Sequence, residues 1–257
     1  HLVPYFGDVD LREISVESVE LYKSRKSATH SAKTVNNHLG ILGKLLADAV
    51  KWEYADRNPA HEVQPLRLPP QDGFNFWEPE QSSAFLEAVK EKRPGWHPFF
   101  LCALHTGMRL GELFALRWQD VDLNKGQIHV RRSYSHGSVT TPKSGRSRTI
   151  PMSPALKAAL KEHKPTDPGE LVFPYREGGY LNRAKIKSTF RTCLKAAGVP
   201  KIRLHDMRHT FASQLVMKGV PMRGVQQLLG HSTLEMTMKY AHLSPSATTS
   251  YVEVLSA

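Results

Sequence analysis

The chain has 257 residues, long enough for one large domain or two smaller ones with a buried core. Its 35 Lys and Arg against 24 Asp and Glu give a formal net charge of +11, which favours a polyanionic partner such as nucleic acid. No apolar run approaches the roughly 18 to 20 residues that span a bilayer, and no signal peptide opens the chain. We therefore expect a cytoplasmic protein without a membrane partner.

Two helices are predicted early in the chain, over residues 13–26 and 32–52, where apolar residues recur at helical spacing. Asn58-Pro59 ends this unit, which we expect to be a small all-α domain over residues 1–64. The unit carries 8 Lys and Arg against 9 Asp and Glu, so the basic excess lies downstream. Because the chain begins at His1 and runs directly into LVPYFGDVDL, we expect that a preceding segment has been removed.

A linker is predicted over residues 65–75, PLRLPPQDGFN, since three prolines and a glycine without periodicity are typical of a semi-rigid connection. A second domain is expected over residues 76–257. The two cysteines, Cys102 and Cys193, lie in apolar helical contexts. We expect buried free thiols there, and neither a disulfide nor a metal site.

Arg109 stands where one apolar helix, ending at Thr106-Gly107, gives way to the next. A helix start is an unfavourable place for a cation because the macrodipole already puts positive charge there. Two interpretations follow. Either Arg109 pairs with Glu112 one turn on, or it joins the positive helix end to bind an anion.

Residues 127–150 change to the alternating pattern of a small antiparallel sheet, with turn signals at Gly137 and Ser144-Gly145. Three basic side chains lie close together at the turn of this segment. They are interpreted either as part of a solvated hairpin tip or as part of a sheet edge that presents lysine to phosphate. Helices are predicted before and after it. The predicted fold class is therefore mainly α with a small antiparallel β-sheet, an α+β domain. The crowded side chains are Lys143, Arg146 and Arg148.

The stretch from residue 204 to 243 gathers several polar groups on predicted helices. His205 and Arg208 are three apart and share one helical face. His205 and His209 have the spacing of a helical zinc pair, but Arg208 between them would repel the ion and no third ligand is convincingly spaced.

Downstream, Gly230 is expected to end a helix and to place His231 in a short loop. Ser232 and Glu235 predict a capping box for a last short helix that carries Tyr240.

In the words TGMRLGEL, TPKSGRSRTIP, LHDMRHTFAS, LLGHS and TMKYAHL stand, in this order, Arg109, Lys143, His205, Arg208, His231 and Tyr240. These six residues resemble the active-site set of the tyrosine recombinases, the phage-integrase family. The resemblance covers residues 74–257, and the unit before it resembles the family's core-binding domain with its first helix or helices missing. It implies a site-specific DNA recombinase or integrase that cleaves and rejoins strands through a 3′-phosphotyrosine intermediate.

Each residue type suits a role that the resemblance implies. Tyr240 is the expected nucleophile, and Arg109 and Arg208 are expected to stabilise the negative charge that gathers on the phosphorane oxygens. Because a phenol with a pKa near 10 is a poor nucleophile, a base must take its proton.

The resemblance assigns that proton acceptance, or the positioning of the tyrosine, to His205. Lys143, on a mobile hairpin, is expected to protonate the leaving 5′ oxygen, and His231 to donate a hydrogen bond to the phosphoryl oxygen. Glu112 and His209 are expected to support the site.

Double-stranded DNA is the partner that the resemblance implies. We expect the protein to be a monomer without DNA and to form a homotetramer on two DNA sites. DNA-bending or directionality factors are further candidate partners. No cofactor or metal is expected, because the phosphotyrosine conserves the energy of the broken bond and the arginines take the place of a Mg²⁺ clamp. Further DNA contacts are expected from Arg146, Arg148, Lys33 and Lys44.

Two other classes of function stay open. A type IB topoisomerase or a hairpin-forming resolvase would share the nucleophile chemistry without exchanging partners, and a DNA-binding protein with a silent site would share only the fold. The segments LHDMRHT and LLGHS favour a recombinase over the first of these, and the presence of all six catalytic residue types disfavours the second. The tail over residues 244–257 is expected to regulate when the tyrosine is presented, in cis or in trans.

Overall fold

The computed structural model describes residues 1–69, 73–142, 145, 147–164, 170–175 and 178–245. It divides into two compact units, His1–Gly73 and Phe74–Ala257. The division falls inside the predicted linker, whose first residues pack on the first unit. There the Asn36 side chain exchanges two hydrogen bonds of 2.8 Å with the backbone of Leu66.

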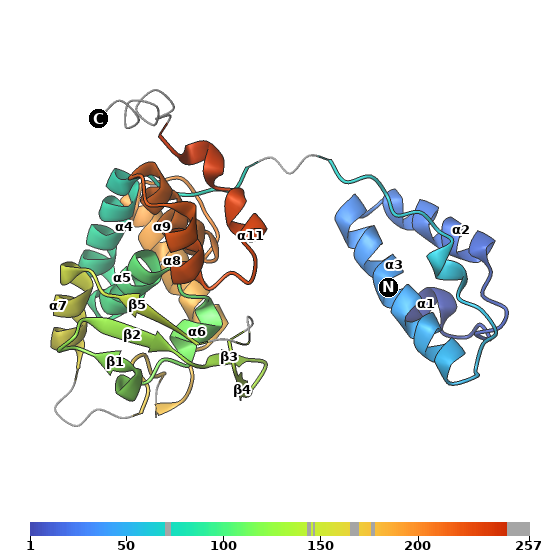
Figure 1. Cartoon of the computed structure of the whole chain (residues 1–257), viewed down its shortest axis with the longest axis horizontal. Coiled ribbons are helices and arrows are strands. Elements are labelled where there is room, and N and C mark those ends of the chain that lie inside the picture. Colours follow the sequence, from blue (N-terminus) through green and yellow to red (C-terminus); the bar gives the residue numbers. More distant parts are fainter. Residues whose placement is uncertain (70–72, 143–144, 146, 165–169, 176–177, 246–257) are drawn as a thin grey trace, which may run out of the picture. The chain divides into compact units, whose positions relative to one another are not determined.

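The first unit consists, among its described residues, of helices and connecting loops (Figure 1). The segments predicted to be helical form α2 and α3, and the hydroxyls of Ser15 and Ser31 cap their first turns. Their facing sides bury Val19, Tyr22 and Leu42 in one small core. The elements are α1 (Val3–Phe6), α2 (Val16–Ser27), α3 (Ala32–Lys51) and the 3₁₀ turn η1 (Pro59–His61).

The second unit builds its main core from helices that surround a cluster of aromatic side chains. Trp77, Phe85 and Phe100 are fully buried in it. The Trp77 indole N–H donates to the Pro200 carbonyl at 2.8 Å, which fixes the chain where it leaves the linker. Both cysteines are buried and free, as predicted. The helices up to the sheets are α4 (Pro79–Lys92), η2 (Pro94–Trp96), α5 (His97–Thr106), α6 (Leu110–Phe114) and η3 (Trp118–Asp120).

The predicted fold class, mainly α with antiparallel pairing over residues 127–150, is confirmed, but the strands form two sheets and not one. β2 pairs with both β1 and β5 and buries Ile128 against the core, while β3 and β4 make a separate hairpin. His136 and Gly137 both have positive φ at the hairpin turn, and this two-residue turn pairs its strands only with each other. The strands are β1 (Val121–Asp122), β2 (Gln127–Val130), β3 (Ser133–Ser135), β4 (Ser138–Thr140) and β5 (Arg148–Pro151).

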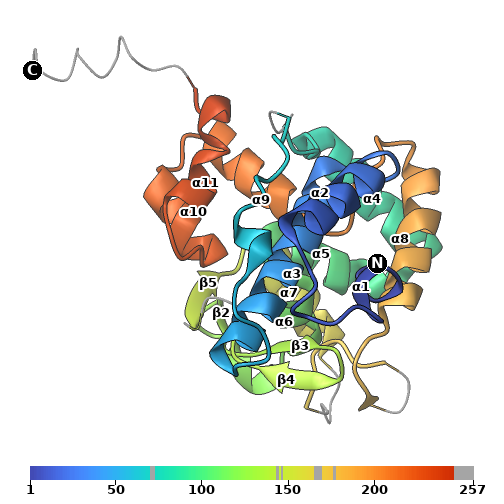
Figure 2. The same ribbon diagram turned by 90° about the vertical axis from the view of Figure 1, so that its right-hand side faces the viewer.

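The C-terminal helices form a second, smaller core beside the first. α9 and α10 pack Phe211, Val216 and Leu229 together, and α10 lies against β5 (Figure 2). Among the described residues, no helix is both long and apolar enough to cross a membrane. The helices after the sheets are α7 (Pro154–His163), α8 (Arg183–Ala197), α9 (Asp206–Met217), α10 (Met222–Leu229), α11 (Glu235–Met238) and η5 (Ala241–Leu243).

The capping box predicted from Ser232 and Glu235 does not form. α11 begins after Leu234 without a side-chain cap, and the Ser232 hydroxyl faces the Met236 sulfur at 3.5 Å. The short helix also ends earlier than predicted. Tyr240 therefore follows α11 and stands at the start of the turn η5.

Candidate active site

Arg109 owes its position to the sharp turn between α5 and α6. Gly107 ends α5 in the left-handed conformation with φ of 59°, and a Cβ there would collide with the Phe211 ring. Two residues later, Arg109 caps α6, and its backbone N–H donates to the Glu112 carboxylate at 2.8 Å. The Arg109 guanidinium donates to the same carboxylate at 3.0 Å. The pairing with Glu112 considered from the sequence is therefore present.

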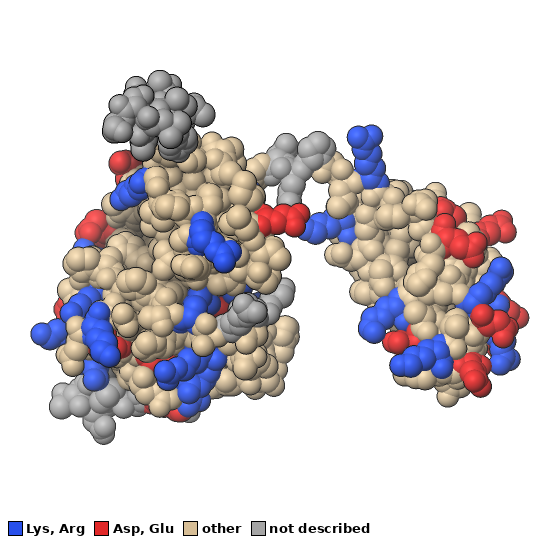
Figure 3. Space-filling model, in the orientation of Figure 1, with Lys and Arg blue, Asp and Glu red and all other residues tan. Residues whose placement is uncertain are grey.

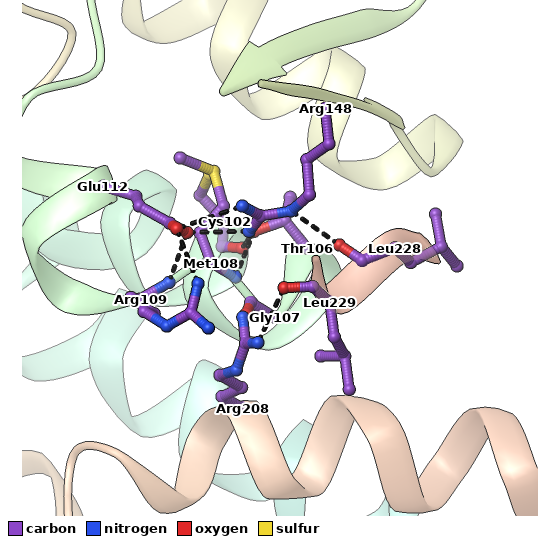
Figure 4. A network of polar contacts seen from close by, with 10 residues as sticks. All are labelled: Cys102, Thr106, Gly107, Met108, Arg109, Glu112, Arg148, Arg208, Leu228 and Leu229. Atoms are coloured by element: carbon purple, nitrogen blue, oxygen red, sulfur yellow. Dashed lines mark hydrogen bonds and ion pairs between the residues drawn. The ribbon is translucent and has the colours of Figure 1, made fainter. Parts of the chain in front are cut away.

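Glu112 is a buried carboxylate that a second arginine also binds. Arg148, the first residue of β5, donates from Nη1 and Nη2 to the two carboxylate oxygens at 3.0 and 2.7 Å (Figure 4). Burial would raise the pKa of Glu112, but the hydrogen bonds and charge of Arg148, together with Arg109, outweigh it and hold the pKa below its usual value. Glu112 is thus ionised between two cations.

Arg208 projects from α9 toward the Arg109 turn. Its Nη1 donates to the Gly107 carbonyl at 2.6 Å and its Nη2 to the Leu229 carbonyl at 2.7 Å. The residue is only 4% exposed, and burial, followed by the charge of Arg109, lowers the pKa of its guanidinium. Because the Leu229 carbonyl belongs to the negative end of α10, the helix compensates part of this buried charge.

The two predicted catalytic histidines have different surroundings. His205, at the start of α9, is exposed, whereas His231 is half-buried in the loop after Gly230, as predicted, with its Nδ1 2.9 Å from the Thr237 hydroxyl. Loss of water and the charges of Arg208 and Arg109 lower the pKa of His231 to about 3. Loss of water and the charge of Arg208 also lower the pKa of His205. Both rings are therefore neutral at pH 7.

Tyr240 is fully buried, so its hydroxyl is not presented to solvent. The hydroxyl lies 2.7 Å from Nδ1 of His209, and the Phe74 ring covers both side chains, with ring-centroid distances of 4.7 Å to Tyr240 and 4.9 Å to His209. Burial raises the pKa of Tyr240, although the charge of Arg208 works against this rise. Burial, followed by the charge of Lys239, lowers the pKa of His209 to about 4, so its neutral ring can accept the phenol hydrogen.

The histidine that contacts the tyrosine is therefore His209, to which the sequence assigned only a supporting role. Phe74 was missed altogether, because it fell in the predicted linker. The FNFW sequence, which crosses the end of that linker at residues 74–77, was the available signal, since aromatic residues are untypical of a solvated connection. Among the described residues, no three His, Cys, Asp or Glu side chains gather as metal ligands.

The predicted basic residues fall into three groups. Lys143 and Arg146 lie outside the described residues. Lys33 and Lys44 are exposed on α3 and, being eleven residues apart, lie on the same face of that helix. Arg148 differs, because its side chain is 7% exposed and its guanidinium is bound within the protein.

Known proteins match both the sequence and the fold. The model of the phage integrase family matches residues 75–247. The tyrosine recombinase XerC-like protein of Caldanaerobacter subterraneus subsp. tengcongensis is 28% identical over 275 residues, which cover 94% of this chain and 70% of the relative. The ICEBs1 integrase of Bacillus subtilis is 28% identical over 264 residues, with 96% and 72% covered.

Solved structures agree at the level of the fold. The Tn1549 transposon integrase in complex with transposon right end DNA superposes with a TM-score of 0.77 at 22% identity, covering 96% of this chain and 87% of that one. The matched proteins are named recombinases and integrases, and these names favour a recombinase over the topoisomerase alternative. The chain therefore belongs to the phage integrase family, the tyrosine recombinases, which cleave and rejoin DNA strands.

Proposed function

We propose that this chain acts on double-stranded DNA and that Tyr240 is its nucleophile. The phenol oxygen forms a bond to the scissile phosphorus while the bond from phosphorus to the 5′ oxygen breaks, which leaves a 3′-phosphotyrosine and a free 5′ hydroxyl. The observation that carries this assignment is the meeting of Arg109 and Arg208 at the Gly107 turn (Figure 4), where the charge of Arg208 also acts on His231 and Tyr240.

The two arginines serve the transition state. Arg109 uses Nη1 for Glu112 and is 21% exposed in its side chain, so the rest of its fork is available to a phosphate oxygen. Arg208 donates to the Gly107 and Leu229 carbonyls and supplies a second positive charge at the Gly107 turn. Charge fixed in advance stabilises a phosphorane without the cost of rearranging solvent.

The proton of the phenol passes to a neutral histidine in this mechanism. His209 holds the hydroxyl while the tyrosine is stored, and His205, exposed at the start of α9, accepts the proton when the tyrosine reaches the phosphate. Lys143 gives the proton to the 5′ oxygen, as the sequence predicts. The reverse transfers rejoin the strand.

DNA binding by both units supports strand exchange in a homotetramer on two sites. Residues 65–257 carry 27 Lys and Arg against 15 Asp and Glu, and Figure 3 shows basic side chains spread over the visible face of the second unit. Such a surface attracts the phosphate backbone. Lys33 and Lys44 supply a basic face on α3, and accessory bending or directionality factors would act on the same assembly.

A covalent adduct tests the nucleophile. Duplexes that cover the DNA on either side of the gene, each with a nick that lets the 5′ product diffuse away, are incubated with the protein and resolved under denaturing conditions. We expect an adduct that Tyr240→Phe abolishes and that Tyr175→Phe, on an exposed tyrosine of the same unit, leaves intact. An adduct that survives Tyr240→Phe would refute the assignment.

A further inference from the structure

Arg148 was expected to contact DNA, yet its side chain is directed into the protein. The guanidinium is bound on three sides, by both oxygens of Glu112 and by the Leu228 carbonyl, to which Nε donates at 2.8 Å. Glu112 in turn accepts four hydrogen bonds, two from Arg148 and two from Arg109. The carboxylate is therefore shared between the arginine that faces substrate and one that does not.

The guanidinium of Arg148 also binds the end of α10, the helix end that binds Arg208. Leu228 and Leu229 are the last residues of α10, and their consecutive carbonyls accept from Arg148 and Arg208 respectively (Figure 4). The negative end of α10 thus holds two cations that come from different elements, β5 and α9.

Gly230 makes this arrangement possible. It ends α10 with φ of 65°, and a Cβ at this position would lie 2.8 Å from Cδ of Arg148. Glycine is required here both for the left-handed turn and for the passage of the arginine side chain. His231 follows directly, so the contact also sets the start of the loop that carries a predicted catalytic histidine.

We propose that Arg148 is a positioning residue, which orients Arg109 through Glu112 and fixes the end of α10 for Arg208 and His231, and that it makes no contact with DNA. The proposal rests on the catalytic roles given above for these three residues. Arginine suits this role because only its planar fork can bind both carboxylate oxygens and a carbonyl at once. Without it, a buried Glu112 would keep one partner in place of two, and its charged form would be disfavoured.

Two variants separate positioning from a DNA contact. Arg148→Met removes the fork, and Glu112→Gln leaves the fork but removes the charge that holds it. Positioning predicts that both lower the single-turnover cleavage rate about 100-fold or more, and that the double variant is no slower than the slower single one. The slope of log affinity for the duplex against log salt stays as in the wild type, because no charged group that contacts DNA is removed.

A DNA contact predicts a different pattern. Arg148→Met would then weaken duplex binding and reduce the slope of log affinity against log salt by about 1, while cleavage at saturating DNA would be unchanged. That result would overturn the proposal. Arg148→Lys, which keeps the charge, should recover only part of the cleavage rate. Arg131→Met is the matched control, because Arg131 is half exposed near the same sheet and pairs with Asp120 at 3.4 Å.

A phosphate titration decides the proposal independently of strand transfer. Inorganic phosphate is added to the protein while NMR signals of the arginine side chains are followed, and thermal melting checks that each variant is folded. We expect both Arg148→Met and Glu112→Gln to weaken binding at Arg109 at least fivefold. Unchanged binding would refute positioning, whereas a wild type that forms no Tyr240-dependent adduct would refute only the proposed function. If Arg148→Met does not fold, Arg148→Lys and Glu112→Gln carry the comparison.

Discussion

The two halves of the site are built in opposite ways. On the arginine side, Arg109 and Arg208 are held by charged or backbone partners at 2.6 to 3.0 Å, so the site that we propose for the phosphate is already formed. On the tyrosine side, Tyr240 is buried under Phe74 with its hydroxyl on His209. In the proposed mechanism, the electrostatic cost of bringing the arginines together is therefore met during folding, whereas Tyr240 must leave its buried position before it can react.

Among the predictions, Arg208→Lys is expected to have the largest effect, a loss of cleavage rate. Lysine keeps a charge but cannot bridge the Gly107 and Leu229 carbonyls while facing a phosphate, so we expect cleavage to fall about 10²- to 10³-fold. Single-turnover cleavage at saturating duplex measures this loss. Arg223→Lys, on an exposed residue of α10, should leave the rate unchanged. Near wild-type cleavage by Arg208→Lys would mean that the geometry of the fork is not needed.

Phe74→Ala should expose the buried side chain of Tyr240. Loss of the ring removes contacts worth about 1–2 kcal/mol, so we expect Tyr240 to become about 5- to 30-fold more reactive toward tetranitromethane. Mass spectrometry of the peptide that contains Tyr240 measures its nitration. Phe76→Ala is the matched control, since Phe76 lies two residues further along the chain and its ring packs against Phe74, with the ring centroids 5.9 Å apart. Equal reactivity in both variants would show that Phe74 does not cover Tyr240.

The smallest expected effect is a pH dependence of stability that comes from His209. Its folded-state pKa of about 4 lies below the unfolded value near 6.5, so the unfolded chain binds the extra proton between these values. Stability should therefore fall as the pH drops from 7 to 5, and His209→Gln should remove about 1–2 kcal/mol of that fall.

Urea unfolding of the wild type and the variant at both pH values measures the difference. His129→Gln, on β2 with its Nδ1 3.0 Å from the Thr149 hydroxyl, is the matched control and should leave the fall unchanged. A fall that is equally steep in His209→Gln would show that burial and the charge of Lys239 do not hold this ring neutral.

Local sequence signals predicted the positions of the helices correctly, but only some of the helix ends. Periodicity located α2 and α3, and the glycines at 107 and 230 correctly ended α5 and α10, because left-handed termini follow from the glycine itself. The capping box at Ser232 failed because α11 starts two residues later than that pattern requires. Alternation over residues 127–150 could not reveal two sheets, since pairing depends on the turn at His136-Gly137.

The sequence by itself determined which chemical groups this protein carries, their order along the chain and the family to which they belong. Only the tertiary structure decided which of them meet. Arg148 binds a carbonyl 80 residues away and Arg208 one 101 residues away, and His209, rather than His205, holds the tyrosine. Such contacts depend on side-chain direction and on burial across separate elements, for which spacing along the chain gives no signal.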